Sequence, residues 1–311
     1  MPETIFCPDD NQPSEMPSLS GRGAPASPAL MLVSTPIGNL KDFSARGCEA
    51  LMAVDVILCE DTRTSAVLLR AHGIKGRLAA LHEHNEDAAI PGILAAMREG
   101  KRYALISDAG TPLVSDPGFR LVRAVIAAGL LVGGVPGANA AVLAVTLSGL
   151  PPQPFYFSGF LAAKAGPRQA ELARLAGAEA AGFSATMVFY EAPHRLAAFL
   201  ADAAAAFGDR PAAVCRELTK HFEEVRRGGL AELARHYEKA PARGEITVVI
   251  GPGSANVASE ADVDAALARA MAAMSLKDAV EAVTAATGLP RRQVYARALE
   301  VGKRQQESSA F

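Results

Sequence analysis

The segment from Ser107 to Gly118 has the residue types of a ligand-binding loop. It contains two Asp, two Gly and two Pro residues together with Ser and Thr. An apolar run at 103–106 precedes it and predicts a buried strand, and the spacing at 119–128 predicts a helix that ends at Gly129. A connector in an α/β unit needs only about two to six residues, so we interpret this longer loop as a site. The alternative is a rigid double turn, in which Pro and Gly only set the backbone dihedral angles.

Four other predicted strands also run into polar loops. Strands alternate with helices here, which predicts a mostly parallel sheet with helices on both faces. The carboxyl ends of all its strands, and hence all five loops, then lie at one edge, where ligands bind in such sheets. A helix is expected to begin after the first loop, near Asp42 as N-cap. The strands are predicted at 30–34, 54–59, 78–81, 103–106 and 130–135, with loops that start at Thr35, Glu60, His82, Ser107 and Pro136.

The proline-rich segment from Leu150 to Pro154 predicts a domain boundary, because these prolines cannot continue the preceding helix. A second α/β unit follows, and Gly251-Pro252-Gly253 separates it from an Ala-rich helical region. The strands of the second unit are predicted at 155–157, 186–190, 212–215 and 246–250. We therefore expect a disordered tail at 1–28, α/β domains at 29–150 and 151–253, and a helical extension at 254–311.

The helical extension has a basic end. Its residues 286–304 contain five basic side chains and one acidic side chain, a local charge of +4 in a chain whose total is −2. A capping box at Ser275, a helix closed by Gly288 and a basic helix after Pro290 outline a small nucleic-acid-binding module. The alternative is a pair of surface helices that completes the domain. The basic residues are Arg291, Arg292, Arg297, Lys303 and Arg304.

Several classes of protein are excluded by missing signals. The chain has no G-x-G-x-x-G after a strand, no P-loop, no G-x-S-x-G and no H-E-x-x-H. No apolar run approaches the roughly 20 residues of a membrane helix, so no membrane partner is expected. The four cysteines are scattered singly, which fits a reducing cytoplasm. His82 and His84 lack a clear third ligand, so we predict a hydrogen-bonded polar loop there and no metal site.

Two further strand ends carry charged groups. Glu60-Asp61-Thr62-Arg63 combines two acids with a guanidinium that could orient a ligand, or it is a helix N-terminus with acids that complement the dipole. Tyr190-Glu191 and His194-Arg195 come within six residues at a strand end of the second unit. For the mixed-charge stretch at 216–224, the default interpretation is a solvated, salt-bridged surface.

Taken together, six segments resemble the signature blocks of the ribosomal RNA small subunit methyltransferase I family, in its order and spacing. The resemblance covers about 30–251 and, more loosely, the terminal basic helices. The blocks are 35–40, 60–63, 84–86, 107–118, 189–195 and 216–220.

The resemblance implies the tetrapyrrole-methylase fold, with S-adenosylmethionine in the cleft between two α/β domains, and usually a homodimer. It implies methylation of the ribose 2′-oxygen of a decoding-region cytidine in 16S rRNA of the small ribosomal subunit, in the cytoplasm. The family holds this cofactor largely through its main chain, which suits loops of small residues. Where the family usually has Pro-Ser, this chain has Ala138-Asn139. By resemblance the cofactor-binding residues are Pro36, Gly38, Asp108, Ala109, Gly110, Thr111, Asn139, Ala140 and Tyr190.

A ribose hydroxyl is a poor nucleophile, so a base that accepts its proton would assist the transfer. The candidates from loop position are Glu60, Asp61, His84 and Glu191, with Arg63 and Arg195 positioning phosphate or ribose. Two other functions stay open at this point. One is a precorrin-type tetrapyrrole methyltransferase, which would hardly need the basic helices, and the other is a non-catalytic ribosome-assembly factor.

Overall fold

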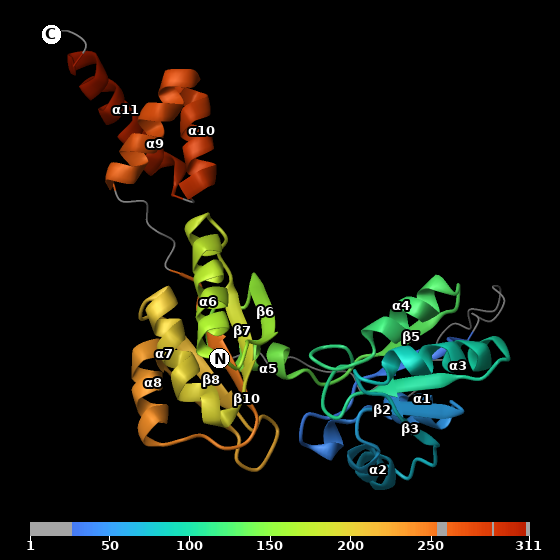
Figure 1. The fold of residues 1–311 in the computed structure, drawn as a ribbon. Helices are drawn as coiled ribbons and strands as arrows, with labels where there is room; N and C mark the ends of the chain where they lie inside the picture. The colour runs from blue at the N-terminus through green and yellow to red at the C-terminus, as the bar shows by residue number, and fades with distance from the viewer. Residues whose placement is uncertain (1–26, 254–259, 288, 309–311) are drawn as a thin grey trace, which may run out of the picture.

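The structure, a computed structural model, describes residues 27–253, 260–287 and 289–308, which form two five-stranded sheets and a group of C-terminal helices (Figure 1). Apart from Ser27 and Pro28, the predicted N-terminal tail lies outside the described residues. Within the described part of the chain, no helix combines the length and apolar composition needed to cross a membrane.

The first sheet was predicted to be mostly parallel; it is parallel throughout and has the strand order β3-β2-β4-β1-β5. Every residue of the interior strands β2 and β4 is buried, which explains their continuous apolar sequences. All five strands end at the same edge, so the polar loops meet there as expected. The strands are β1 (Leu30–Val33), β2 (Val56–Cys59), β3 (Leu78–Ala80), β4 (Tyr103–Ile106) and β5 (Val132–Val135).

Helices cover both faces of this sheet, because alternate residues of each strand point to opposite sides. On one face Ile57 and Ile106 pack with α1 (Ala45–Met52) and α2 (Thr62–Ala71). On the other, Leu58 and Leu105 pack with α3 (Glu86–Arg98) and α4 (Phe119–Ala127).

The predicted helix start at Asp42 is wrong. Leu40–Asp42 is a single 3-10 turn, η1, and Phe43 returns to extended backbone with its ring buried. The α-helix starts after Ser44, whose hydroxyl oxygen accepts the Gly47 N–H at 3.0 Å. Ser is as good an N-cap as Asp, so the burial of Phe43 decides where the helix begins.

The second sheet is mixed and has the order β6-β7-β10-β8-β9. Only β6 and β7 are parallel, and the other neighbours are antiparallel. β9 lies in a charged stretch where no strand was predicted, because an edge strand with the sequence EVRRGG shows little apolar alternation. The strands are β6 (Phe155–Phe160), β7 (Thr186–Glu191), β8 (Pro211–Arg216), β9 (Glu224–Gly229) and β10 (Ile246–Ile250).

One face of the second sheet is covered by α6 (Ala165–Ala180), α7 (Leu196–Phe207) and α8 (Leu230–Lys239). The opposite face is covered by α5 (Ala140–Ser148), which comes from the first α/β unit in chain order. Its Ala144 and Val145 pack against β7, β8 and β10. The division at 150 and 151 stays a prediction, and α5 connects the two sheets whatever boundary is chosen.

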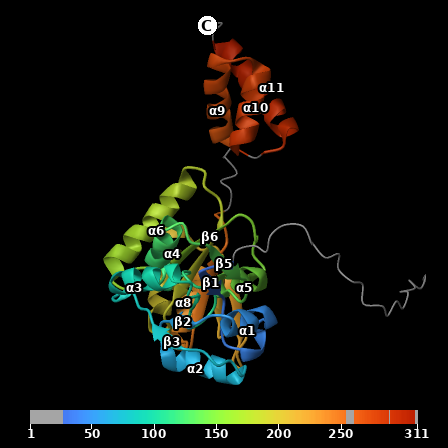
Figure 2. The ribbon, with the colours of Figure 1, turned by 90° about the vertical axis from the view of Figure 1, so that its right-hand side faces the viewer.

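The C-terminal helices α9 (Glu260–Ala273), α10 (Leu276–Thr287) and α11 (Arg291–Ser308) share a core of their own. Ser275 caps α10, as predicted, by accepting the Asp278 N–H and donating to the Asp278 carboxylate. Figure 2 shows these helices apart from the two sheets. The core of this module is formed by Val263, Leu267, Val280, Val283, Val294, Ala298 and Val301.

Candidate active site

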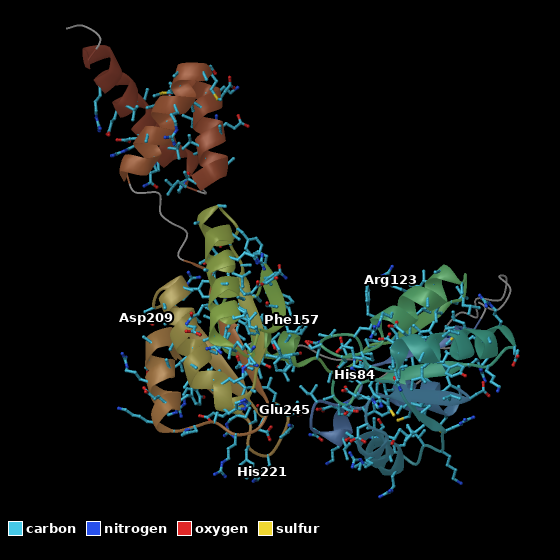
Figure 3. All side chains as sticks on the ribbon, viewed as in Figure 1. His84, Arg123, Phe157, Asp209, His221 and Glu245 are labelled. Carbon is cyan, nitrogen blue, oxygen red and sulfur yellow. The ribbon has the colours of Figure 1, made fainter. Side chains whose placement is uncertain are left out.

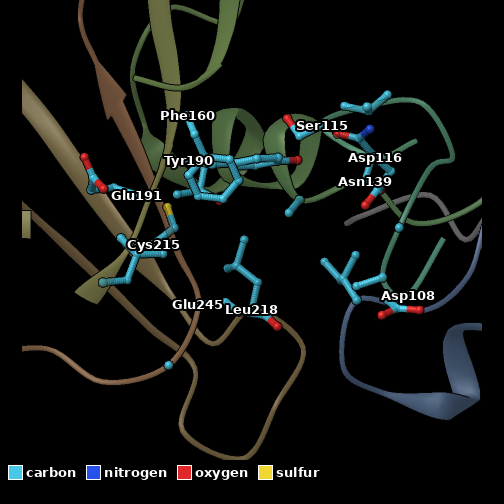
Figure 4. A pocket seen from close by; sticks show the side chains of 18 of the residues that line it. Asp108, Ser115, Asp116, Asn139, Phe160, Tyr190, Glu191, Cys215, Leu218 and Glu245 are labelled. Atoms are coloured by element: carbon cyan, nitrogen blue, oxygen red, sulfur yellow. The ribbon is translucent and has the colours of Figure 1, made fainter. Parts of the chain in front are cut away.

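A cavity of ≈ 400 Å³ lies where the loop edge of the first sheet meets the second sheet (Figure 4). Its lining comes from the loops after β1, β4 and β5, and from β6, β7, β8 and β10 of the second sheet. Several loops therefore build the site, as expected, but the second sheet supplies about half of its wall. Of the residues predicted from sequence, the cavity is lined by Asp108, Ala109, Gly110, Thr111, Asn139, Ala140, Tyr190 and Glu191.

The loop after β4 begins with a tight turn fixed by backbone hydrogen bonds. Thr35 N–H donates to Gly110 O at 2.8 Å, and Gly110 N–H donates back to Thr35 O at 3.2 Å. The Ser107 hydroxyl also donates to Gly110 O, at 2.8 Å. Gly110 has φ +84°, a left-handed conformation that glycine adopts without strain. The loop is thus both a rigid turn and part of the cavity wall.

Side chains then connect this loop to the start of α5. Thr111 donates its hydroxyl to Ala138 O at 3.1 Å and accepts from Asn139 Nδ2 at 3.2 Å. The side-chain oxygen Oδ1 of Asn139 accepts the Val142 N–H and so caps α5. Asn139 therefore serves as the N-cap of α5.

The second half of the same loop has an unusual backbone. Leu113 and Ser115 have φ +71° and +68°, and Gly118 has φ +116°. A Cβ on Gly118 would lie 2.4 Å from Leu105 Cδ2, so the chain turns there against the core. This path turns the segment with Ser115 and Asp116 toward the cavity, where both residues form part of the wall.

The sequence placed Asp116 in the loop interpreted as a site, but no individual role was predicted for it. It is half-buried in the cavity wall. Burial, together with the charges of Glu60 and Asp108, raises the pKa of its carboxyl to about 6. Phe160, Leu218 and Glu245 of the wall were also missed. Leu218 lies in the block at 216–220, which was interpreted as a solvated surface, and all three residues reach the cavity only through the packing of the second unit.

Tyr190 enters the cavity from β7 beside two other aromatic rings. Its ring centroid lies 4.9 Å from that of Phe157 and 5.5 Å from that of Phe160. Burial raises the pKa of the Tyr190 hydroxyl, while a hydrogen bond from the Ala141 backbone acts in the opposite direction. The hydroxyl is therefore protonated at neutral pH. Figure 4 shows the ring between the second sheet and Asn139.

Glu191, the next residue along β7, faces the other way. Its side chain is fully buried and lies 2.9 Å from Arg195 Nε, and it accepts the Ala192 N–H at 2.7 Å. Arg195 in turn donates to Leu161 O at 2.8 Å. The ion pair thus holds the segment that follows Phe160 in place. Both the Glu191 carboxylate and the Arg195 guanidinium are therefore occupied by partners within the protein.

Seven of the predicted residues lie outside the cavity wall: Pro36, Gly38, Glu60, Asp61, Arg63, His84 and Arg195. Asp61 caps α2 and accepts from the Arg63 backbone at 2.8 Å and from the Arg63 side chain at 3.0 Å. The Arg63 side chain is 90% exposed. Asp61 N–H donates to Asp108 Oδ1 at 3.1 Å, so this loop reaches the site through Asp108. Glu60 and His84 are exposed, and Figure 3 shows His84 on the side of the first sheet that faces the second.

The segment that contains His82 and His84 is the polar loop that was predicted. Asn85 accepts the His82 N–H at 2.7 Å and donates to Ala80 O. Glu86 is buried and accepts the Leu121 N–H at 2.7 Å, at the start of α4. Among the described side chains, no group of three or more His, Cys, Asp or Glu residues is arranged to hold a metal ion.

Pro36 and Gly38 flank Ile37, which lines the cavity. Gly38 lies against the second unit, where a Cβ on it would be 2.4 Å from Lys220 Cγ. Lys220 pairs with Glu217 at 2.9 Å and with Glu245 at 3.0 Å, and Asn39 N–H donates to the Thr219 hydroxyl at 3.1 Å. The loop at 217–220 thus joins the two units beside the cavity and does more than expose charge to solvent.

Comparisons with known proteins agree with this architecture. A family model described as Tetrapyrrole (Corrin/Porphyrin) Methylases matches residues 29–234, and one described as RsmI C-terminal HTH domain matches 257–302. The crystal structure of the methyltransferase CobJ is 18% identical, with a TM-score of 0.55 over 74% of this chain and 95% of that chain. Uroporphyrin-III-C-methyltransferase from Thermus thermophilus is 22% identical, with a TM-score of 0.51 over 71% and 93%. The fold is therefore that of the tetrapyrrole methylase class.

Full-length relatives are more specific. Ribosomal RNA small subunit methyltransferase I of Mesorhizobium japonicum is 47% identical and covers 89% of this chain and 93% of that protein. The proteins of the same name from Micromonospora olivasterospora and Pseudomonas aeruginosa are 45% and 41% identical, over 86% and 87% of this chain and 86% and 96% of their own lengths. The chain belongs to the ribosomal RNA small subunit methyltransferase I family.

Proposed function

We propose that this protein transfers a methyl group from S-adenosylmethionine to the ribose 2′-oxygen of a decoding-region cytidine in 16S rRNA, with the small ribosomal subunit as substrate. Membership of the family supports methyl transfer as the reaction and ribosomal RNA of the small subunit as the substrate. The observation that carries the proposal is the cavity between the two sheets, whose wall contains the family's loop residues in intact, hydrogen-bonded form.

The cavity fits the proposed cofactor in size and chemistry. Its volume falls within the range of about 300 to 1,000 Å³ that is usual for small-molecule sites. Ile37, Leu218 and Cys215 provide an apolar wall for an adenosine. The carboxylate of Asp108 complements the positive charges that the cofactor carries on its sulfonium and ammonium groups. Burial raises the pKa of Cys215 to about 11, so its thiol is a neutral part of the wall and not a competing nucleophile.

When bound, S-adenosylmethionine supplies an electrophilic methyl group. The protein's own task is then alignment, for which effective molarity contributes about 7 to 11 kcal/mol in well-oriented reactions. We assign cofactor binding to those predicted cofactor-binding residues that line the cavity. Pro36 and Gly38, which do not line it, hold Ile37 in place. We assign a positioning role to Glu191 and Arg195, because their ion pair fixes the rim that carries Phe160.

The C-terminal helices are proposed to bind RNA. Arg291 and Arg292 are exposed at the first turn of α11, where the helix dipole also favours phosphate. Tyr295, one turn further along, is 48% exposed and offers an aromatic face to a base. Arg297 and Arg304 instead pair with Asp264 and hold α11 against α9. The basic end thus combines structural pairs with cations that face solvent.

Two accompanying proposals follow from the family. The ribosomal substrate implies that the protein acts in the cytoplasm. The proposed homodimer has a candidate contact on α4, where Phe119 and Ile126 are 59% and 61% exposed and lie seven residues apart on one helix face.

The test uses labelled S-adenosylmethionine, the purified protein and small ribosomal subunits that lack their native methylations. We expect label in the RNA, recovered after digestion as 2′-O-methylcytidine. Label in a base, or in a different nucleotide, would refute the proposed target. Binding of the cofactor without RNA labelling would favour a tetrapyrrole substrate, and absence of cofactor binding would favour a non-catalytic assembly factor.

A further inference from the structure

One carboxylate of the cavity wall has no partner. Among the described residues, four acids line the cavity, and three of them are engaged: Asp108 accepts the Asp61 N–H, Glu191 pairs with Arg195, and Glu245 pairs with Lys220. Within the same described part of the chain, Asp116 has neither a hydrogen bond nor an ion pair. Its carboxylate oxygens are therefore available to a group in the cavity.

The backbone holds Asp116 at this position rather than leaving it on an open loop. The left-handed residues Leu113 and Ser115 precede it, and Gly118, pressed against Leu105, follows. The ionisable groups that act on its carboxyl are Glu60 after β2, Asp108 after β4 and, across the cavity, Tyr190 on β7. None of these groups is a cation, so no neighbouring positive charge pairs with the Asp116 carboxylate.

We infer that Asp116 is the group that accepts the proton of the ribose 2′-hydroxyl during methyl transfer, an inference that rests on the proposed function. The 2′-oxygen forms a bond to the methyl carbon, and the carbon–sulfur bond breaks with its electron pair passing to sulfur. The hydroxyl proton moves to an Oδ atom of Asp116 and from there to solvent. Charge balances, because the positive sulfonium is lost as the proton is released.

The electrostatic surroundings suit this role. Burial and the two neighbouring carboxylates raise the pKa of Asp116 to about 6, close to neutral pH, where a general base is most effective. The candidates from sequence are less well placed: Asp61 and Glu191 are engaged by arginines, and Glu60 and His84 do not line the cavity. Asp116 combines position, availability and basicity.

The first experiment separates chemistry from cofactor binding. In Asp116→Asn, single-turnover methylation of subunits should slow by roughly 100-fold or more, while the calorimetric Kd for S-adenosylmethionine changes less than about threefold. Glu238→Gln, which removes an exposed carboxylate on α8, is the matched control and should leave both unchanged. A Kd that rises in parallel with the loss of rate would make Asp116 a cofactor anchor and overturn the inference, as would an unchanged rate.

The second experiment needs no cofactor. Carboxyl ¹³C NMR of the protein alone, with the Asp116 signal assigned by its absence in Asp116→Asn, should give a pKa near 6. In Glu60→Gln this pKa should fall, because a neighbouring negative charge is removed, and the acid limb of the pH–rate profile should move to lower pH with it. If the pKa of Asp116 falls in Glu60→Gln but the acid limb of the pH–rate profile does not move, the inference is overturned. If the wild-type protein labels no RNA, the proposed function fails first; if it labels RNA and Asp116→Asn does so equally, only this inference fails.

Discussion

At the scale of single residues, the site depends on side chains that hold the backbone of the cavity loops in place. Asn139 and Thr111 illustrate this, since their hydrogen bonds connect the loop after β4 to the start of α5. Neither has to touch a ligand through its side chain in order to shape the cavity. Asn caps this helix as well as Ser would.

Asn139→Ala is expected to lower the free energy of unfolding by about 1 kcal/mol, since the cap is lost. It should also weaken cofactor binding, because Thr111 loses its Asn139 partner. Asn139→Ser restores the cap and should recover most of the stability. Denaturant titration and calorimetry measure the two effects. Equal stability of the Ala and Ser variants would contradict the capping role.

At the scale of elements, the loops at the edge of the first sheet hold each other in place. Glu86, in a block that resembles the family signature, is buried, accepts the Leu121 N–H in the first turn of α4 and pairs with the guanidinium of Arg120. It thereby fixes the end of the loop that carries Asp116. The role of this acid is structural support for α4.

Glu86→Ala should reduce the free energy of unfolding by about 2 kcal/mol, because it leaves the buried Leu121 N–H without an acceptor. The adjacent Asp87 also pairs with Arg120 but is 71% exposed, so Asp87→Ala should cost less than about 1 kcal/mol. Denaturant titration of both variants gives the comparison. Similar losses for the two would show that the buried hydrogen bond does not matter.

At the scale of the whole molecule, we propose that catalysis and RNA binding reside in separate parts, each with its own apolar core. The described residues of α9, α10 and α11 form their own apolar cluster, while the cavity lies between the two sheets. The segment between these parts, 254–259, lies outside the described residues. Loss of the C-terminal helices should therefore leave the cavity intact.

A chain that ends at residue 253 should bind S-adenosylmethionine with a Kd within about twofold of the full chain and methylate subunits at least tenfold more slowly, since phosphate contacts are lost. In the full chain, Arg291→Gln with Arg292→Gln should weaken subunit binding and make it less dependent on salt. Filter binding at several salt concentrations measures this. Unimpaired methylation by the truncated chain would refute the RNA-binding role.

The proposed dimer gives a second prediction at this scale. Ile126→Glu places a charge in the exposed apolar face of α4. Burying this charge in a dimer contact would cost desolvation free energy, so the protein should shift toward the monomer in sedimentation velocity. Glu238→Gln serves again as the surface control. A wild-type protein that sediments as a monomer at all concentrations, or an unaffected dimer in the variant, would exclude this contact.

The sequence by itself determined the alternation of strands and helices, the parallel first sheet, the loop cluster at its edge and the family. These follow from local signals: apolar runs, turn formers and short motifs act over a few residues. Only the tertiary structure decided which polar groups enter the cavity. Tyr190 and Glu191 are neighbours in sequence but face opposite sides of β7, and β9 forms because β8 offers a free edge. The Asp61 carboxylate is engaged by Arg63, its neighbour in the chain, whereas Asp108 receives the Asp61 N–H from a segment that only the fold brings close, and no described segment brings a partner to Asp116.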